Sequence, residues 1–74
     1  DGLRVEELVV PADFASTPLG SIAPKSKDYL LMATHEQGRW VFNPPDDHPI
    51  RAGVTLVFMA GPDGRAHLER LLMA

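Results

Sequence analysis

Apolar residues cluster in three short runs, at residues 3–10, 29–34 and 54–60, with prolines and glycines between them. Each run predicts a strand, because apolar runs of this length bounded by turn residues are typical of sheets. The run at 29–34 is almost continuous, so we expect this strand to be buried on both faces.

A hairpin is predicted after the second run. Residues 35–38 (His-Glu-Gln-Gly) have the composition of a four-residue turn, and residues 39–42 return as a short strand. In this return strand Trp40 and Phe42 share one face and Val41 takes the other. Trp40 is either a core residue or an anchor for a second subunit, and the sequence leaves both open.

A short helix is predicted within residues 12–27. Ser16 or Thr17 has the chemistry of its N-cap, with Pro18 at the first helical position. Pro24 limits this helix to about two turns.

A longer helix is predicted over residues 65–73, with Asp63 as its N-cap. Its leucines recur at three- and four-residue spacing and form one apolar stripe: Leu68, Leu71 and Leu72. Residues 43–49 hold three prolines and are expected to stay irregular.

The order strand, helix, three strands, helix predicts an α+β fold, with a small four-stranded, largely antiparallel sheet covered by helices on one face. The chain has 74 residues, so we expect positions 1–74 to form a single domain. There is no cysteine to supply a disulfide, so we expect a partner subunit or a larger parent chain to add stability. An open sheet edge or an uncovered apolar face is where such a partner would dock.

Charge narrows the classes of partner. Seven basic residues against ten acidic ones give a net charge of −3, which argues against a nucleic acid polymer. No apolar run approaches the roughly 20 residues that span a bilayer. The chain begins at Asp1 rather than at methionine, so we expect a piece excised from a larger protein.

Candidate chemistry is sparse. Asp46, Asp47 and His48 offer oxygen and imidazole ligands for a cation, but turn chemistry in an exposed loop explains them better, and we predict no metal site. His35 and Glu36 are expected at an exposed hairpin tip. No nucleophile, Walker or dinucleotide motif is present, so we predict no catalytic residues and no enzyme. A metal-dependent enzyme built from these five residues is the weakest alternative.

The order and spacing of several segments resemble the TrkA-C domain, also called the RCK C-terminal lobe. The segments that carry the resemblance are Val9-Val10-Pro11, Thr17-Pro18-Leu19-Gly20-Ser21-Ile22, Gly38-Arg39-Trp40-Val41-Phe42-Asn43-Pro44-Pro45, Ile50-Arg51-Ala52-Gly53, Leu56-Val57-Phe58-Met59-Ala60-Gly61 and the helix ending in Leu71-Leu72. The resemblance spans nearly the whole chain. One position departs from the family pattern, since Val54 stands where an aspartate usually follows the glycine.

The resemblance implies a regulatory role on the cytoplasmic side of the cell membrane. Such domains belong to potassium channels and cation transporters, follow an upstream Rossmann-like lobe, form homodimers, and bind nucleotides, cyclic dinucleotides or divalent cations. The ligand would sit between two copies and bias their geometry. A purely structural oligomerisation domain that binds no small molecule is the alternative.

Candidate ligand-binding residues follow from that reading. They lie at the predicted start of the short helix and in the proline-rich loop: Leu19, Gly20, Ser21, Asn43, Asp46, Asp47 and His48. No residue pattern in the sequence specifies the ligand or a cofactor.

Overall fold

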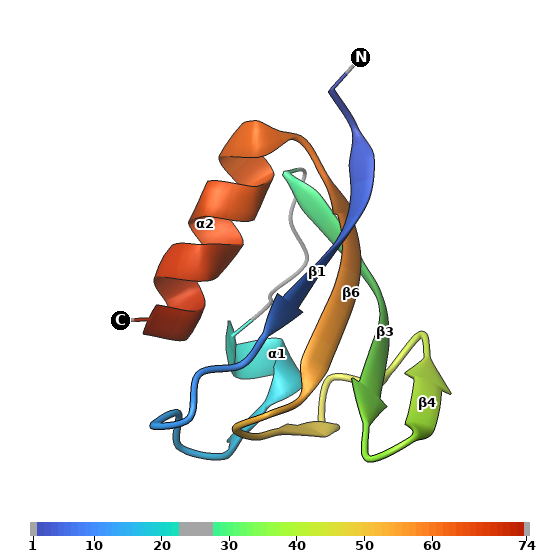
Figure 1. The fold of residues 1–74 in the computed structure, drawn as a ribbon, viewed down its shortest axis with the longest axis vertical. Helices are drawn as coiled ribbons and strands as arrows, with labels where there is room; N and C mark the ends of the chain where they lie inside the picture. The colour runs from blue at the N-terminus through green and yellow to red at the C-terminus, as the bar shows by residue number, and fades with distance from the viewer. Residues whose placement is uncertain (1, 23–27, 74) are drawn as a thin grey trace.

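A computed structural model describes residues 2–22 and 28–73 and has an α+β fold, as the sequence predicts (Figure 1). The main sheet has four antiparallel strands in the order β1-β6-β3-β4: β1 (Arg4–Val9), β6 (Thr55–Ala60), β3 (Tyr29–Glu36) and β4 (Arg39–Phe42). A second, two-stranded sheet pairs β2 (Thr17–Pro18) with β5 (Pro49–Ile50). The helices are α1 (Leu19–Ile22) and α2 (Pro62–Met73).

The core lies between the main sheet and the two helices. Alternation along the central strand β6 buries Leu56, Phe58 and Ala60 on the side of α2. These residues belong to two buried clusters that share partly buried Leu8 and Leu31. The buried members are Val10, Leu19, Ile22, Ile50, Val54, Leu56 and Leu72 in one cluster, and Tyr29, Phe58, Ala60 and Leu68 in the other.

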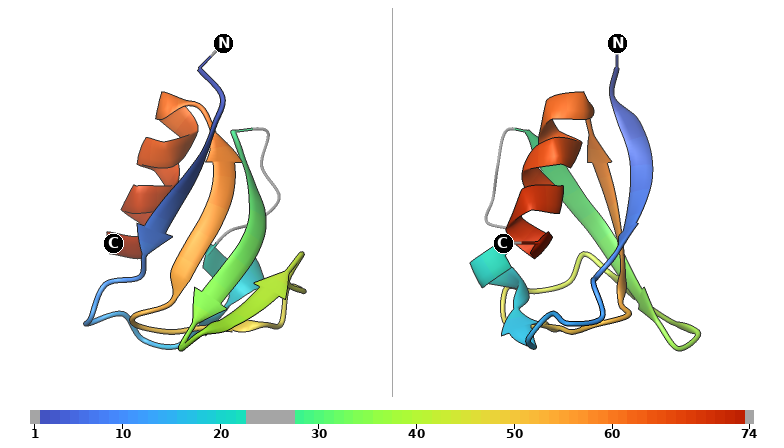
Figure 2. Two further views of the ribbon diagram at one scale, coloured as in Figure 1. Left: turned by 45° about the vertical axis from the view of Figure 1, so that its right-hand side comes forward. Right: turned by 60° about the vertical axis from the view of Figure 1, so that its left-hand side comes forward.

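The prediction that residues 29–34 are buried on both faces is wrong. Leu30 is 63% exposed and Met32 is 37% exposed, because α1 and α2 lie on the same side of the sheet and cover one face only (Figure 2). The pairing of β3 with β6 also shifts register between Leu31 and Ala33. This irregularity gives the strand a bulge that sequence periodicity does not reveal.

The hairpin turn is shorter than predicted. Strand β3 continues through Glu36, and the turn consists of Gln37 and Gly38 alone, with φ of 51° and 78°. A two-residue turn with both φ values positive matches the twist of the flanking strands. Glu36 therefore pairs with Arg39 and belongs to the sheet.

The short helix begins one residue later than predicted. Pro18 pairs with Pro49 in the small sheet, and the Thr17 hydroxyl donates to the carbonyl of Ala15 at 2.8 Å. The prediction that residues 43–49 stay irregular is therefore wrong at Pro49, which belongs to strand β5. Residues 23–27 of the predicted helical stretch lie outside the described residues.

Helix α2 begins at Pro62, three residues earlier than predicted. The Arg65 N–H donates to the Gly61 carbonyl at 3.0 Å, so Gly61 occupies the capping position and Asp63 lies in the first turn. Proline suits this start because its missing N–H has no helical acceptor there. The carboxylate of Asp63 still favours the positive end of the helix.

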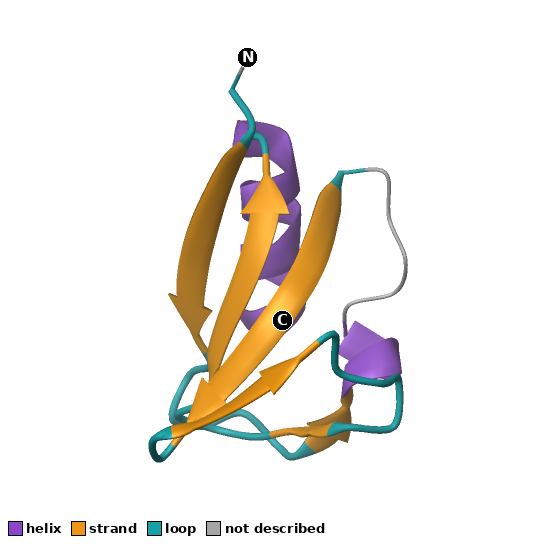
Figure 3. Ribbon diagram, turned by 90° about the vertical axis from the view of Figure 1, so that its right-hand side faces the viewer, coloured by secondary structure: helices purple, strands orange, loops and turns teal. Residues whose placement is uncertain are grey.

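Among the described residues, no helix covers the face of the main sheet turned away from α2, and Figure 3 shows this face toward the viewer with α2 behind. We call it the open face and define it by three rows of residues paired across the strands. The rows are Val5, Met59 and Leu30; Glu7, Val57, Ala33 and Phe42; and Val9, Thr55, His35 and Trp40. Glu7 is the one acidic or basic residue of these rows, histidine aside, so the open face is largely apolar.

Candidate functional site

The structure brings part of the predicted ligand site together through backbone hydrogen bonds. The Leu19 N–H donates to the His48 carbonyl at 2.9 Å, and the Gly20 N–H donates to the Asp46 carbonyl at 2.8 Å. A Cβ on Gly20 would lie 3.0 Å from the Cβ of Asp46, so glycine permits this close approach. The start of α1 and the proline-rich loop therefore form one unit.

Those same bonds change what the site offers to a ligand. The amides of Leu19 and Gly20 already donate to loop carbonyls, so neither is free to hold an anion. Ser21, Asn43 and Asp47 are exposed. Asn43 lies apart from the others, at the start of the loop, where its N–H donates to the Met32 carbonyl at 2.8 Å.

The acidic and histidine residues do not converge on a cation. Within residues 2–22 and 28–73 no group of three or more His, Cys, Asp or Glu side chains is placed to hold a metal ion. His35 and Glu36 are neighbours in β3 and point to opposite faces of the sheet, as consecutive strand residues do. The His35 ring stacks on Trp40 with centroids 4.3 Å apart.

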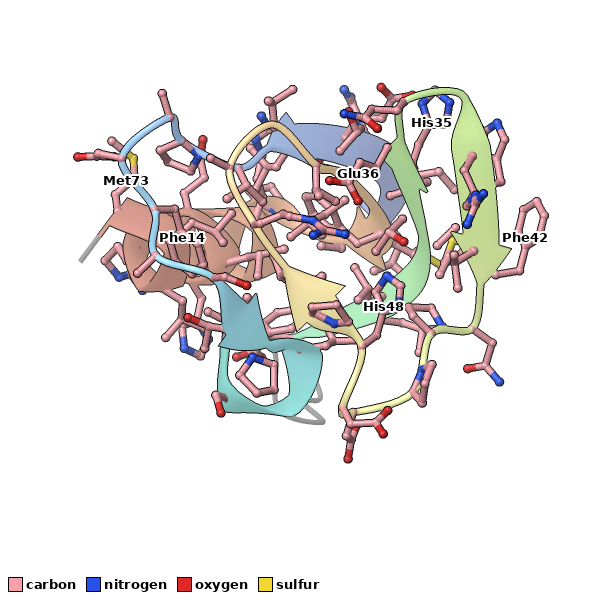
Figure 4. The ribbon with its side chains drawn as sticks, turned by 90° about the horizontal axis from the view of Figure 1, so that it is seen from below. Phe14, His35, Glu36, Phe42, His48 and Met73 are labelled. Carbon is pink, nitrogen blue, oxygen red and sulfur yellow. The ribbon has the colours of Figure 1, made fainter. Side chains whose placement is uncertain are left out.

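A cleft of about 510 Å³ opens between the β3–β4 hairpin and the segment from His48 to Arg51. We call it the hairpin cleft. Its lining residues come from both walls: Thr34, Glu36, Gln37, Arg39, Val41, His48 and Arg51. Figure 4 views this end of the molecule and shows Glu36 and His48 on the inner side of the hairpin, with Phe42 on the outer side.

Polar groups of opposite charge meet in the hairpin cleft. The Arg51 guanidinium donates two hydrogen bonds to the Glu36 carboxylate, from Nε at 2.9 Å and from Nη2 at 3.3 Å. Arg39 pairs with Glu36 across the hairpin, which puts its side chain on the same face of the sheet. The Thr34 hydroxyl lies 3.4 Å from Nε2 of His48.

Of the predicted site residues, only His48 lines this cleft. Thr34, Arg39 and Arg51 were not predicted as site residues, and Glu36 was a candidate only for the metal-dependent enzyme. A signal was available in the hairpin: Thr34 and Glu36 alternate along β3, and a Gln-Gly turn places Arg39 and Val41 opposite them. The placement of Arg51 depends on a long-range contact that no local pattern encodes.

A second cleft of about 400 Å³ lies between the loop after β1 and the C-terminal end of α2. Its lining includes Phe14, Leu72 and Met73, and among the described lining residues Asp13 is the one with a charged side chain. Phe14 and Met73 lie at the far side of Figure 4 from Phe42.

No known protein-family profile matches the chain, and no curated protein matches it either. Across the described residues, neither helix has the length and apolar character needed to cross a membrane. The site is thus defined by its own geometry: a polar cleft on one side of the hairpin and an apolar open face on the other.

Proposed function

We propose that this chain is a ligand-sensing, dimerising regulatory domain of a potassium channel or cation transporter, on the cytoplasmic side of the cell membrane. The resemblance of its segments to the TrkA-C domain suggests that class. In this proposal an upstream Rossmann-like lobe connects the domain to a membrane pore or transporter. A nucleotide, a cyclic dinucleotide or a divalent cation would bias the geometry of a homodimer, by binding one arrangement more tightly than another.

One observation carries the dimerising half of this proposal, namely the open face. Phe42 is 74% exposed and Leu30 is 63% exposed on a face that neither α1 nor α2 covers. The rings of His35, Trp40 and Phe42 stack in sequence, with Trp40 and Phe42 centroids 5.9 Å apart. Large apolar faces of this kind mark interaction surfaces on soluble proteins.

A second copy of the chain fits the open face by size and by chemistry. The molecule measures 32 × 25 × 18 Å, and the open face runs along its longest and shortest axes. The 32 × 18 Å side of the molecule that carries this face sets an upper limit of roughly 600 Å² per copy, or about 1,200 Å² between two copies, at the lower end of specific interfaces. Homodimer interfaces are also the most apolar class, in keeping with a face that carries a single carboxylate, Glu7.

Sedimentation equilibrium of the chain tests this dimer. We expect a dimer at about 100 µM, because a face of this size supports micromolar association when its aromatic anchors are well placed. Phe42→Ser and Leu30→Ser should each shift the chain toward monomer by tenfold or more in dissociation constant, at about 1.4 kcal/mol per decade.

Met73→Ser is the matched control, because Met73 is 77% exposed but lies on α2, away from the open face. It should leave the dissociation constant unchanged. A wild-type monomer at this concentration contradicts the proposed dimer. So does a Met73→Ser variant that dissociates as readily as Phe42→Ser.

A further inference from the structure

We infer that the hairpin cleft binds the phosphate group of a small ligand, through Arg39 and Arg51. This inference gives the proposed ligand-sensing function its binding site and rests on that function for its biological meaning. It places the ligand inside one copy of the chain, and not at the start of α1, where the Leu19 and Gly20 amides are already bonded.

The charges of the cleft favour an anion although the whole chain is acidic. Two guanidinium groups, from Arg39 and Arg51, share the cleft with one carboxylate, from Glu36. Glu36 is bonded to Arg51, and within the described residues no carboxylate lies at ion-pair distance from Arg39. One positive charge is therefore left for a ligand, presented by the fork-shaped donors that suit phosphate oxygens.

A hydroxyl and an imidazole, which share one hydrogen bond, also line the cleft beside the arginines. The Thr34 hydroxyl is buried at 2% exposure of its residue, and the His48 ring lies 3.4 Å from it. Both line the inner wall of the cleft. A cleft of about 510 Å³ also falls within the range of small-molecule sites, so it has room for more than the phosphate alone.

Glu36 acts as an internal competitor for the ligand. Its carboxylate holds Arg51 by two hydrogen bonds, at 2.9 and 3.3 Å, and thereby fixes the guanidinium in the wall of the cleft. A bound phosphate replaces part of this pairing, and the negative charge of Glu36 repels it. Removing that charge should strengthen phosphate binding.

The test is an NMR titration of the chain with inorganic phosphate at pH 7, followed through backbone amide shifts. Sodium chloride keeps the ionic strength constant, because a change in salt concentration by itself alters the interactions of exposed charges. We expect saturable shifts confined to residues 34–41 and 48–51. Arg39→Gln and Arg51→Gln should each weaken binding by about tenfold, since each removes a charge-assisted contact. Glu36→Gln should strengthen binding several-fold.

Arg70→Gln is the control, because Arg70 is an exposed arginine of α2 outside the cleft. It should leave the phosphate affinity unchanged. The inference is overturned if Arg70→Gln weakens binding as much as Arg39→Gln, or if the shifts map elsewhere. It is also overturned if malonate, a dicarboxylate probe, binds as tightly as phosphate. Sedimentation without phosphate decides the dimer separately, so failure of one proposal does not imply failure of the other.

Discussion

Tyr29 has a polar group in an apolar setting. The residue is 6% exposed, and within the described residues its hydroxyl has no hydrogen-bond partner. Its ring packs edge-on against His67 of α2, with centroids 5.7 Å apart. The ring therefore stabilises the contact between sheet and helix, whereas the unpaired hydroxyl costs free energy.

Replacing Tyr29 by phenylalanine separates these two contributions. The ring contacts remain and the unpaired hydroxyl is gone, so we expect a free energy of unfolding at pH 7 between unchanged and about 1 kcal/mol higher. Urea unfolding of the two chains measures the difference. A loss of stability greater than about 1 kcal/mol would mean that the hydroxyl has a stabilising partner.

The same variant carries a pH prediction. Burial, and next the negative charge of Asp28, raise the pKa of the Tyr29 phenol above its ordinary value. The folded chain then holds this proton at pH values where the unfolded chain has lost it. The contribution of the Tyr29 phenol to the free energy of unfolding is fully present below the unfolded pKa of about 10. It is lost as the pH rises from there through the folded pKa. Above pH 10 the wild type should lose more stability than Tyr29→Phe, and equal losses contradict the assignment.

At the scale of elements, sequence patterns predicted the features that depend on residues close together in the chain. Strand β4 (Arg39–Phe42) has the predicted bounds, and the alternation of Trp40 and Phe42 against Val41 holds. The small sheet of β2 and β5 was missed because it joins segments about thirty residues apart, each only two residues long. Such pairs need the folded chain to bring them together, so no window of sequence reveals them.

The contact between α2 and the start of β3 is another long-range feature. Gly64 is buried in the first turn of α2, and a Cβ built on it would lie 1.9 Å from the carbonyl oxygen of Asp28. The neighbouring atom belongs to the backbone, so it has little freedom to move aside. Glycine at this position lets the helix approach the sheet.

Gly64→Ala should therefore destabilise the fold although alanine is the better helix former. The propensity gain of about 1 kcal/mol is outweighed by overpacking, and we expect a net loss of about 1–3 kcal/mol in urea unfolding. Gly61→Ala is the control, because its Cβ would meet nothing closer than 3.8 Å. It should lose less, at most about 1 kcal/mol for a weaker helix cap. Equal losses in both variants would rule out the proposed clash.

At the scale of the whole molecule, the candidate site shows the limit of sequence reasoning. The sequence pointed to α1 and the proline-rich loop, and the structure joins Leu19 to His48 and Gly20 to Asp46. It did not point to Arg39 or Arg51, because their shared cleft depends on how the loop folds back against the hairpin. The sequence identified short polar residues in turns as candidates. It could not identify two arginines on distant segments, because they come together only in the folded chain.

The two proposed surfaces lie back to back on one element. The inner side of the β3–β4 hairpin carries Thr34, Glu36 and Arg39 in the cleft, and its outer side carries Trp40 and Phe42 on the open face. Strand β4 is an edge strand that pairs with β3 only, so it is held by fewer hydrogen bonds than the interior strands and moves more readily. A ligand that holds this hairpin against the 48–51 segment therefore also sets the position of the aromatic side chains outside.

This arrangement predicts that phosphate binding and dimerisation are coupled. We expect saturating phosphate to change the dimer dissociation constant by about fivefold or more at constant ionic strength, as coupling free energies of 1–3 kcal/mol imply. Sedimentation equilibrium with and without phosphate measures the change. By linkage, the phosphate affinities of the dimer and the monomer should differ by the same factor. The Phe42→Ser variant, expected to be a monomer, supplies the monomer affinity for this comparison. Arg39→Gln should keep the dimer and lose its response to phosphate. If Arg39→Gln responds as the wild type does, phosphate acts on the dimer as a salt, and the hairpin does not link the two surfaces.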